Sequence, residues 1–156
     1  MPSNRKAMKK DLQAKLTRFG AMCRQKGFRL THQRLEIFRE LAKDSRHPSA
    51  EAIYKRIVKR FPTLSLDTVY RTISTLEKIG VIKRVHILDD RGRFDANVAV
   101  HHHLVCKRCK RVEDFYWPSF DQLNIPEQLK GWGNLDSKHV ELRGLCRRCA
   151  GKYPKI

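Results

Sequence analysis

Two pairs of cysteines are the residues whose type and spacing most directly suggest chemistry. Cys106 and Cys109 form one CxxC pair, and Cys146 and Cys149 form a second. Two thiolates from one tight turn can point at a single ion, so two such pairs supply a tetrahedral Zn²⁺ site. Four sulfurs leave no position for water or substrate, which predicts a structural zinc ion. The alternative, a pair of redox-active dithiols, needs a thioredoxin-like βαβ setting that the flanking residues do not offer.

Three consecutive histidines stand shortly before the first cysteine pair. If this segment is a strand, His101 and His103 project from one face and His102 from the other. The β-like run that follows could bring the carboxylate of Asp114 to the first face. Histidines flanked by Asp95 and Asp114 indicate a metal site, although a histidine-rich loop that binds metal adventitiously is the alternative.

The first half of the chain reads as helical, and the pattern then changes to short β-rich runs. Apolar spacing and breakers predict helices over residues 9–26, from Thr31 onward, from Ser49 to a stop at Pro62, and over residues 65–80. Strands are expected at residues 81–88 and 93–96, joined by a turn at 89–92. Helices followed by a basic hairpin predict a winged helix-turn-helix, in which the last helix enters the major groove of DNA.

The fourth expected helix has one apolar face and one polar face. The apolar face carries Leu66, Val69, Ile73 and Leu76, and the polar face carries Tyr70, Arg71, Ser74 and Thr75. Arginine suits bidentate contact with guanine, and tyrosine or threonine can contact phosphates or thymine methyl groups. An ordinary solvated helix face is the alternative. The basic residues of the hairpin favour DNA contact, and they are Lys83, Arg84, Arg91 and Arg93.

Net charge supports a polyanionic partner. The 156 residues include 34 Lys and Arg against 16 Asp and Glu, a formal charge of +18, which favours nucleic acid. A basic membrane-surface protein would concentrate its charge on one long amphipathic helix, and no segment does so. No apolar run reaches transmembrane length and the first residues lack a signal-peptide core, so a cytoplasmic protein that does not contact membranes is expected.

The ordered set of motifs resembles the ferric uptake regulator family of bacterial metal-dependent DNA-binding proteins, over about residues 15–150. The matching segments are residues 30–34, 47–54, 65–72 and 93–95, followed by the histidine-rich strand and both CxxC pairs. The resemblance implies an α+β homodimer that binds duplex DNA at a pseudo-palindromic operator. Its N-terminal winged-helix domain would span residues 1–96, its hinge 97–102, and its C-terminal α/β dimerisation domain with the four-cysteine zinc site 103–156.

The same resemblance implies a regulatory metal between the two domains. Carried over position by position, its ligands would be His47, Asp95, His101, His103 and Asp114. Imidazoles and carboxylates without a thiolate suit Fe²⁺ or Mn²⁺. The family's additional site in the dimerisation domain would correspond to His102, Asp121 and His139. Val100 occupies a position where some members have another histidine, so this second site would be incomplete.

One ligand distinguishes between branches of the family. Asp114 stands where iron-sensing members have Glu and peroxide-sensing members have Asp, so the chain most resembles the peroxide-responsive repressors. In that branch, peroxide oxidises a coordinating histidine at positions that match His47 and His101. Arg71 is instead more similar to the iron-sensing branch, and we assign it to the choice of DNA sequence. The remaining cysteine, Cys23, is expected to be a buried structural thiol.

The resulting hypothesis is a metal-dependent transcriptional repressor that senses hydrogen peroxide and is not an enzyme. An iron- or manganese-responsive repressor of the same family would keep every ligand. A zinc-ribbon RNA-binding protein would explain the cysteines and the charge, but it would leave the histidines and aspartates without a purpose. A zinc-dependent hydrolase needs an open metal position, whereas the five ligands look saturated.

Overall fold

Hydroxyl side chains begin three of the helices in the first part of the chain. The structure is a computed structural model in which α1 spans Ser3–Gln25, α2 His32–Lys43, α3 Ala50–Ile57 and α4 Leu66–Lys78. The side chains of Thr31, Ser49 and Ser65 each accept a hydrogen bond from the backbone N–H three residues later. They satisfy a donor that the first turn would otherwise leave unpaired. The helix starts expected at these residues are confirmed.

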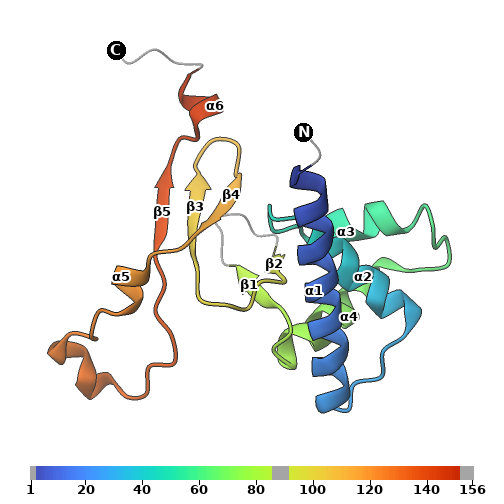
Figure 1. The fold of residues 1–156 in the computed structure, drawn as a ribbon, viewed down its shortest axis with the longest axis horizontal. Coiled ribbons are helices and arrows are strands. Elements are labelled where there is room, and N and C mark those ends of the chain that lie inside the picture. The colour runs from blue at the N-terminus through green and yellow to red at the C-terminus, as the bar shows by residue number, and fades with distance from the viewer. Residues whose placement is uncertain (1–2, 86–91, 152–156) are drawn as a thin grey trace. The chain divides into compact units, whose positions relative to one another are not determined.

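The structure describes residues 3–85 and 92–151, with the backbone alone for residues 3–8. The chain divides into two units, Met1–Val98 and Ala99–Ile156. Within the described ranges, α1–α4 and a β-hairpin form the first unit, and a mixed sheet with short helices forms the second (Figure 1). The expected α+β class is confirmed. The domain limits at residues 96 and 103 and the hinge over 97–102 stay predictions.

Several expected boundaries differ from the structure. Helix α1 begins at Ser3, six residues before the expected start, because residues 4–9 include good helix formers that make no apolar pattern. Helix α3 ends at Ile57, five residues before Pro62. Strand β1 covers Lys83–Val85 and β2 covers Arg93–Asp95. The expected strand residues 86–88 and turn residues 89–91 lie outside the described residues.

The core of the first unit draws side chains from all four helices. Phe19 of α1 stacks on Phe38 of α2, with ring centroids 4.0 Å apart. Ile53 and Ile73 bring α3 and α4 into the same cluster and are fully buried. Cys23 is also fully buried, as expected, and its burial raises the pKa of the thiol despite the nearby arginines. This packing fixes the exposed face of α4 relative to the hairpin.

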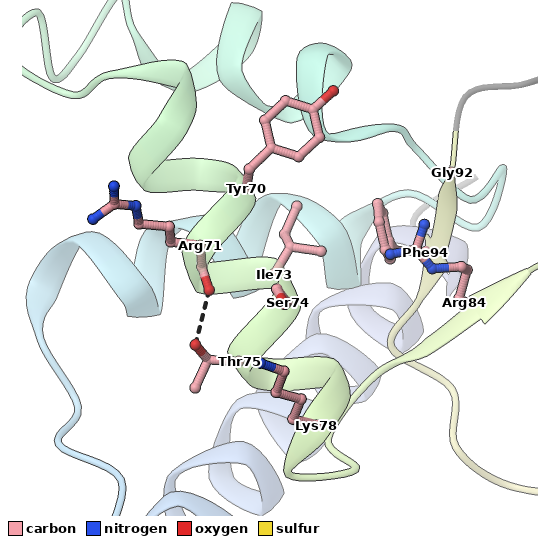
Figure 2. A pocket seen from close by; sticks show the side chains of 9 residues that line it. All are labelled: Tyr70, Arg71, Ile73, Ser74, Thr75, Lys78, Arg84, Gly92 and Phe94. Carbon is pink, nitrogen blue, oxygen red and sulfur yellow. Dashed lines mark hydrogen bonds between the residues drawn. The ribbon is translucent and has the colours of Figure 1, made fainter.

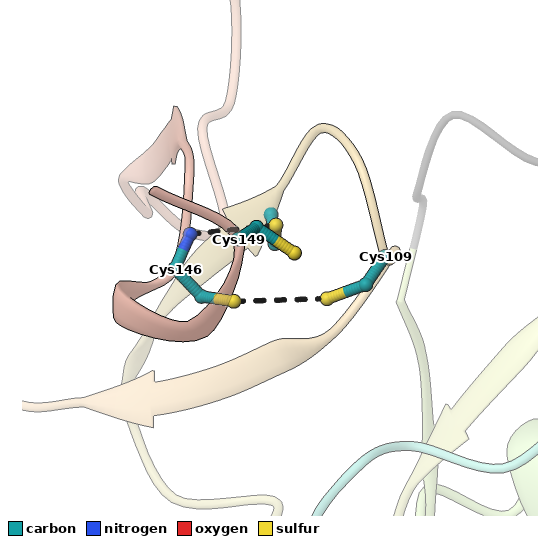
Figure 3. A group of neighbouring side chains, drawn as sticks. Cys109, Cys146 and Cys149 are labelled. Carbon is teal, nitrogen blue, oxygen red and sulfur yellow. Dashed lines mark hydrogen bonds between the residues drawn. The ribbon is translucent and has the colours of Figure 1, made fainter. Parts of the chain in front are cut away.

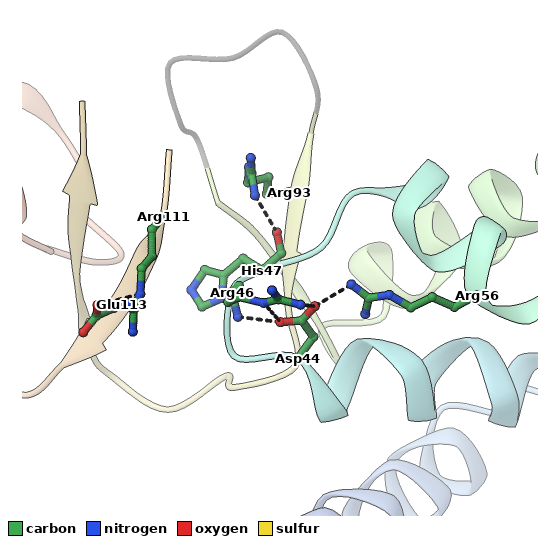
Figure 4. A network of polar contacts seen from close by, with 7 residues as sticks. All are labelled: Asp44, Arg46, His47, Arg56, Arg93, Arg111 and Glu113. Carbon is green, nitrogen blue, oxygen red and sulfur yellow. Dashed lines mark hydrogen bonds and ion pairs between the residues drawn. The ribbon is translucent and has the colours of Figure 1, made fainter. Parts of the chain in front are cut away.

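The loop between α2 and α3 is held against β2. Ser49 and Arg93 form an isolated antiparallel bridge, and the N–H of Phe94 donates to the carbonyl of Pro48 over 3.2 Å. Arg93 also donates to the carbonyl of His47 over 3.5 Å (Figure 4). His47 itself has a φ of 57°, a left-handed conformation that costs a residue with a side chain about 1 kcal/mol. Surrounding contacts must therefore stabilise this loop.

Asp44 is the centre of those contacts. The side chain of Arg46 donates two hydrogen bonds to its carboxylate, over 2.9 and 3.1 Å, and the backbone N–H of Arg46 donates a third over 3.0 Å. Arg56 of α3 donates a fourth over 2.7 Å (Figure 4). Burial alone would raise the pKa of Asp44, but these hydrogen bonds hold the pKa well below its usual range. The carbonyl of Asp44 also accepts from the N–H of His47. Through Asp44, the network thus connects α3 to the backbone of His47.

Replacing Asp44 with asparagine should lower the free energy of unfolding of the first unit by about 1 kcal/mol. A carboxylate whose folded pKa is depressed contributes stability above its unfolded pKa, near 3.9, and loses it as pH falls toward the folded value. The difference from wild type should therefore shrink between pH 5 and pH 3 in urea titrations followed by helical circular dichroism. Asp11→Asn, which removes an exposed carboxylate paired with Lys15, is the control. A pH-independent difference would contradict this role.

The second unit has a three-stranded sheet with few buried side chains. Its elements are β3 (His102–Cys106), β4 (Val112–Phe115), α5 (Pro118–Asp121), the 3-10 helix η1 (Glu127–Trp132), β5 (Glu141–Gly144) and α6 (Arg147–Ala150). The strand order is β4-β3-β5, with β3 antiparallel to β4 and parallel to β5. Leu142 of β5 and Leu145, which follows that strand, are 47% and 53% exposed. The sheet therefore depends on something other than an apolar core.

None of the helices in the described ranges combines the length and apolar content needed to cross a membrane.

Candidate metal centres and nucleic-acid interface

The four cysteines come together at one end of the second unit. Cys106 ends β3, Cys109 lies in the β3–β4 turn, and Cys146 and Cys149 flank the start of α6 (Figure 3). The Sγ atoms lie within 4.8 Å of one another, and those of Cys109 and Cys146 are 3.8 Å apart. Tetrahedral Zn²⁺ with Zn–S bonds of about 2.3 Å places its sulfurs about 3.8 Å apart. The cluster has the geometry and the donor set of a structural zinc site.

Backbone N–H groups lower the pKa of two of the four thiols, which favours the thiolate form that binds a cation. The N–H of Cys146 donates to the Sγ of Cys106 over 3.4 Å, and this bond, with the N–H of Cys109, lowers the pKa of the Cys106 thiol to about 6. The N–H of Arg111 lowers the pKa of Cys109 in the same way. Burial raises the pKa of Cys149 to about 12, so its deprotonation needs a bound cation.

The histidine-rich strand brings three of the expected regulatory ligands together within the second unit. His103 of β3 is paired directly with Asp114 of β4. The Nε2 atoms of His101 and His103 lie 3.1 Å apart, and Asp114 Oδ1 is 3.9 and 3.8 Å from them. Two nitrogens at that separation, each about 2.1 Å from one ion, would subtend an angle near 90°. His101, His103 and Asp114 therefore form a candidate half-site that could offer three ligands to one ion.

The tautomer of His101 also suits metal binding. Its Nδ1 lies 2.9 Å from the carbonyl oxygen of Ala99, an acceptor that requires Nδ1 to carry the proton. Nε2 then presents its lone pair toward His103 and Asp114. Such outer-shell hydrogen bonds orient metal-binding histidines and raise their basicity.

The first unit contributes a second, two-ligand half-site. His47 is 1% exposed and its Nε2 lies 3.8 Å from Oδ2 of Asp95, the last residue of β2. The loop contacts with β2 described above bring these two side chains together. Both residues are ligands implied by the family resemblance, and the imidazole and carboxylate suit Fe²⁺ or Mn²⁺. Joint binding of one ion by both half-sites stays a prediction.

The possible second site is present as a pair. His102 is fully buried and contacts the rings of Phe115 and Phe120, and its Nε2 lies 3.2 Å from Asp121. The N–H of Val140 donates to its Nδ1 over 3.1 Å, so Nε2 carries the proton in the neutral ring. No third ligand joins this pair in the part of the chain that the structure describes. His139 is exposed, and its role in such a site stays a prediction.

The two faces of α4 follow the predicted division in part, because Leu66, Ser74 and Thr75 are half-buried. Val69, Ile73 and Leu76 are buried, together with Thr72, whereas Tyr70 and Arg71 are exposed. A groove of about 510 Å³ separates this helix from the hairpin (Figure 2). The residues that line it are Tyr70, Arg71, Ile73, Ser74, Thr75, Lys78, Arg84, Gly92 and Phe94. Lys83 is exposed on β1. The groove thus combines apolar surface with cationic side chains from both elements.

Acidic side chains that the sequence did not single out position this surface. Glu77 accepts two hydrogen bonds from Arg84, each 3.1 Å long, and these raise the pKa of the guanidinium. Glu51 of α3 accepts from the hydroxyl of Tyr70. Asp67 pairs with Arg71 one helical turn away, over 2.8 Å. Only the last pair has a sequence signal, the i,i+4 spacing; the others depend on packing between elements.

Comparison with known proteins identifies relatives that match most of the chain. A model of the ferric uptake regulator family matches residues 25–143. The peroxide-responsive repressor PerR of Staphylococcus epidermidis is 32% identical over 83% of this chain and 86% of its own. A solved zinc-bound manganese uptake regulator is 31% identical, covers 81% of this chain and 97% of its own, and has a TM-score of 0.63. The ferric uptake regulator of Helicobacter pylori, 24% identical over 88% of this chain and 93% of its own, has the same fold, with a TM-score of 0.68.

Proposed function

The chain belongs to the ferric uptake regulator family of metal-responsive regulators, and on that basis we propose that it is a dimeric DNA-binding repressor that senses hydrogen peroxide. The observation that carries the proposal is the half-site of His101, His103 and Asp114, which offers nitrogen and oxygen ligands without a thiolate. Such a set suits Fe²⁺, which supplies one-electron chemistry toward peroxide when bound. The relatives named peroxide-responsive repressors support the same signal.

Two half-sites on two units explain how an ion could control DNA binding. One ion held by His47 and Asp95 of the first unit and by His101, His103 and Asp114 of the second would fix the angle between the units. Its binding free energy would favour the conformation that docks on DNA. In the oxidation of His47 or His101, one oxygen atom of the peroxide is added to the imidazole ring and the other oxygen leaves as water. The altered ring is a poorer ligand, so the ion and the DNA-binding conformation are lost together.

Exposed apolar side chains in the second unit support a dimer. Trp117, Leu123 and Trp132 are 44%, 59% and 76% exposed, and Leu142 on β5 adds to them. Large exposed apolar side chains of this kind are what a subunit interface would bury. Each copy of α4 in a two-fold dimer would contact one half of a pseudo-palindromic DNA operator.

The DNA-binding part of the proposal is tested with Arg71. The protein loaded with Mn²⁺ should select a pseudo-palindromic sequence from a pool of random duplexes. Arg71→Ala should weaken binding to that sequence by roughly 5- to 150-fold, because one bidentate arginine–guanine contact contributes about 1–3 kcal/mol. Lys130→Ala, which removes an exposed cation from the second unit, should leave binding unchanged. A preference for single-stranded RNA over every duplex would favour the zinc-ribbon alternative instead.

An iron- or manganese-responsive repressor of metal homeostasis genes is the second candidate. Arg71 in α4 is the observation that favours it, since the residue is more similar to the iron-sensing branch. Such a repressor would bind DNA in the same metal-dependent way but would keep its histidines intact in peroxide. Response to peroxide therefore separates the two candidates.

A further inference from the structure

Both CxxC turns carry cations between and beside their cysteines. The first turn contributes Lys107, Arg108 and Lys110, and α6 contributes Arg147 and Arg148. We refer to these five side chains as the knuckle cations. Together with Arg111 and Arg143 they account for seven of the eleven Lys and Arg residues in 99–156. The positive charge of the second unit is therefore concentrated at its four-cysteine end.

Contacts between the two turns hold the knuckle cations at one place. The N–H of Lys107 donates to the carbonyl of Gly144 over 2.8 Å, which ties the first turn to the segment before α6. The Sγ atoms of Cys109 and Cys146 are 3.8 Å apart. Figure 1 shows the β3–β4 turn and α6 at the same end of the sheet. Two segments far apart in sequence thus bring their cationic residues to one end of the sheet.

Most of the knuckle cations make no ion pair with the carboxylates of the described residues. Arg111 pairs with Glu113 over 2.7 Å and Arg143 pairs with Glu141, so these two neighbours are already compensated. Among the described residues, by contrast, no carboxylate lies within ion-pair distance of four knuckle cations. These four are Lys107, Lys110, Arg147 and Arg148, and all except the partly buried Lys110 are exposed. Their charge is available to a partner.

The zinc site does not account for this charge either. Zn²⁺ with four thiolates has a net charge of −2, so nearby cations stabilise it electrostatically. Four uncompensated cations exceed that requirement by two positive charges, even without Arg108. Most of their side chains also extend into solvent, where their interaction with the thiolates is strongly screened. The excess points to an external anion.

We propose that the knuckle cations form a second nucleic-acid-binding surface, which contacts the phosphates of duplex DNA independently of α4. Arginine and lysine are the usual phosphate partners, and contacts of this kind need no base recognition. The surface rests on the proposed function only for the choice of duplex DNA as the polyanion. Residues 104–111 and 142–151 contain no aromatic side chain. Single strands are bound largely by stacking on aromatic side chains, so the phosphate backbone of a duplex fits this surface better than a single strand does.

Salt dependence of DNA binding tests the proposal on the full-length protein. The variant Lys107→Gln/Arg148→Gln removes one cation from each turn, and Lys130→Gln/Lys138→Gln removes two from elsewhere in the same unit as a matched control. Zinc- and Mn²⁺-loaded proteins are titrated with one fixed duplex by fluorescence anisotropy at several KCl concentrations. The slope of log K against log salt should fall by about 1.8 per protomer for the first variant, since each phosphate contact contributes about 0.9. The control should keep the wild-type slope, and zinc content should stay at one ion per chain in every protein.

An unchanged slope in the Lys107→Gln/Arg148→Gln variant would overturn the proposal. If that variant instead loses affinity only for polyglutamate, used as a model acidic partner, the surface serves an acidic protein and the DNA assignment is again wrong. Failure of the proposed function gives a different pattern. In that case Arg71→Ala would leave operator binding intact, whether or not the knuckle variant changes the slope.

Discussion

Replacing Cys109 with serine should release the structural zinc and unfold the second unit, while α1–α4 stay folded. The second unit buries few apolar side chains, chiefly Val105 and Val112, so metal binding must supply much of its folding free energy. Apparent zinc-binding energies of about 10–16 kcal/mol in small zinc domains exceed what such a core provides. Zinc content by atomic emission and amide hydrogen exchange resolved by segment measure the two effects separately.

Cys23 offers a matched control for this experiment. It is the fifth cysteine, fully buried in the first unit and remote in sequence from the CxxC pairs. Cys23→Ser should keep one zinc ion per chain and a protected second unit, although the buried hydroxyl should destabilise the first unit modestly. Full zinc content with native protection of residues 99–151 in the Cys109 variant would show that the four-cysteine assignment is wrong.

Replacing Asp114 with alanine should abolish metal-stimulated DNA binding and leave the zinc in place. The change removes one of three proposed ligands whose donor atoms lie within 4 Å of one another. Loss of an outer-shell partner alone typically weakens metal affinity about 10- to 100-fold, so loss of a direct ligand should exceed 100-fold. Mn²⁺ affinity by isothermal titration and duplex affinity with and without Mn²⁺ are the measurements. His47→Ala should behave in the same way.

The neighbouring residue of Asp114 provides the control. Glu113 also lies on β4, points to the opposite face as strand geometry requires, and pairs with Arg111. Glu113→Ala should therefore keep wild-type Mn²⁺ affinity and metal-stimulated DNA binding. Metal-dependent operator binding that survives in both the Asp114 and His47 variants would remove these residues from the regulatory site.

Local signals in the sequence were enough to predict the elements that carry the chemistry. The hydroxyl caps Ser49 and Ser65, the apolar stripe of α4 and the CxxC spacing each depend on residues within one or two turns. The alternation of β3 correctly separates His102 from His103, because strand side chains point to opposite faces. Such features can be predicted because they depend on neighbouring residues and not on distant contacts.

Features that depend on distant contacts could not be predicted in this way. The pairing of Arg84 with Glu77 and of Asp44 with Arg56 joins residues of different elements. The left-handed backbone of His47 has no glycine or asparagine to signal it. Leu142 alternates as a core residue would, yet it stays exposed, because an alternating strand pattern does not say whether its apolar face meets a core or a partner.

Mass spectrometry of the metal-loaded protein after peroxide treatment tests the central claim most directly. Protein is loaded anaerobically with Fe²⁺ or Mn²⁺, given a small excess of hydrogen peroxide and digested, while duplex binding is followed in parallel. The account predicts one added oxygen on the peptide with His47 or His101, only with Fe²⁺ and together with loss of DNA binding. Unmodified histidines with retained DNA binding would contradict peroxide sensing and leave a sensor of metal levels as the better description.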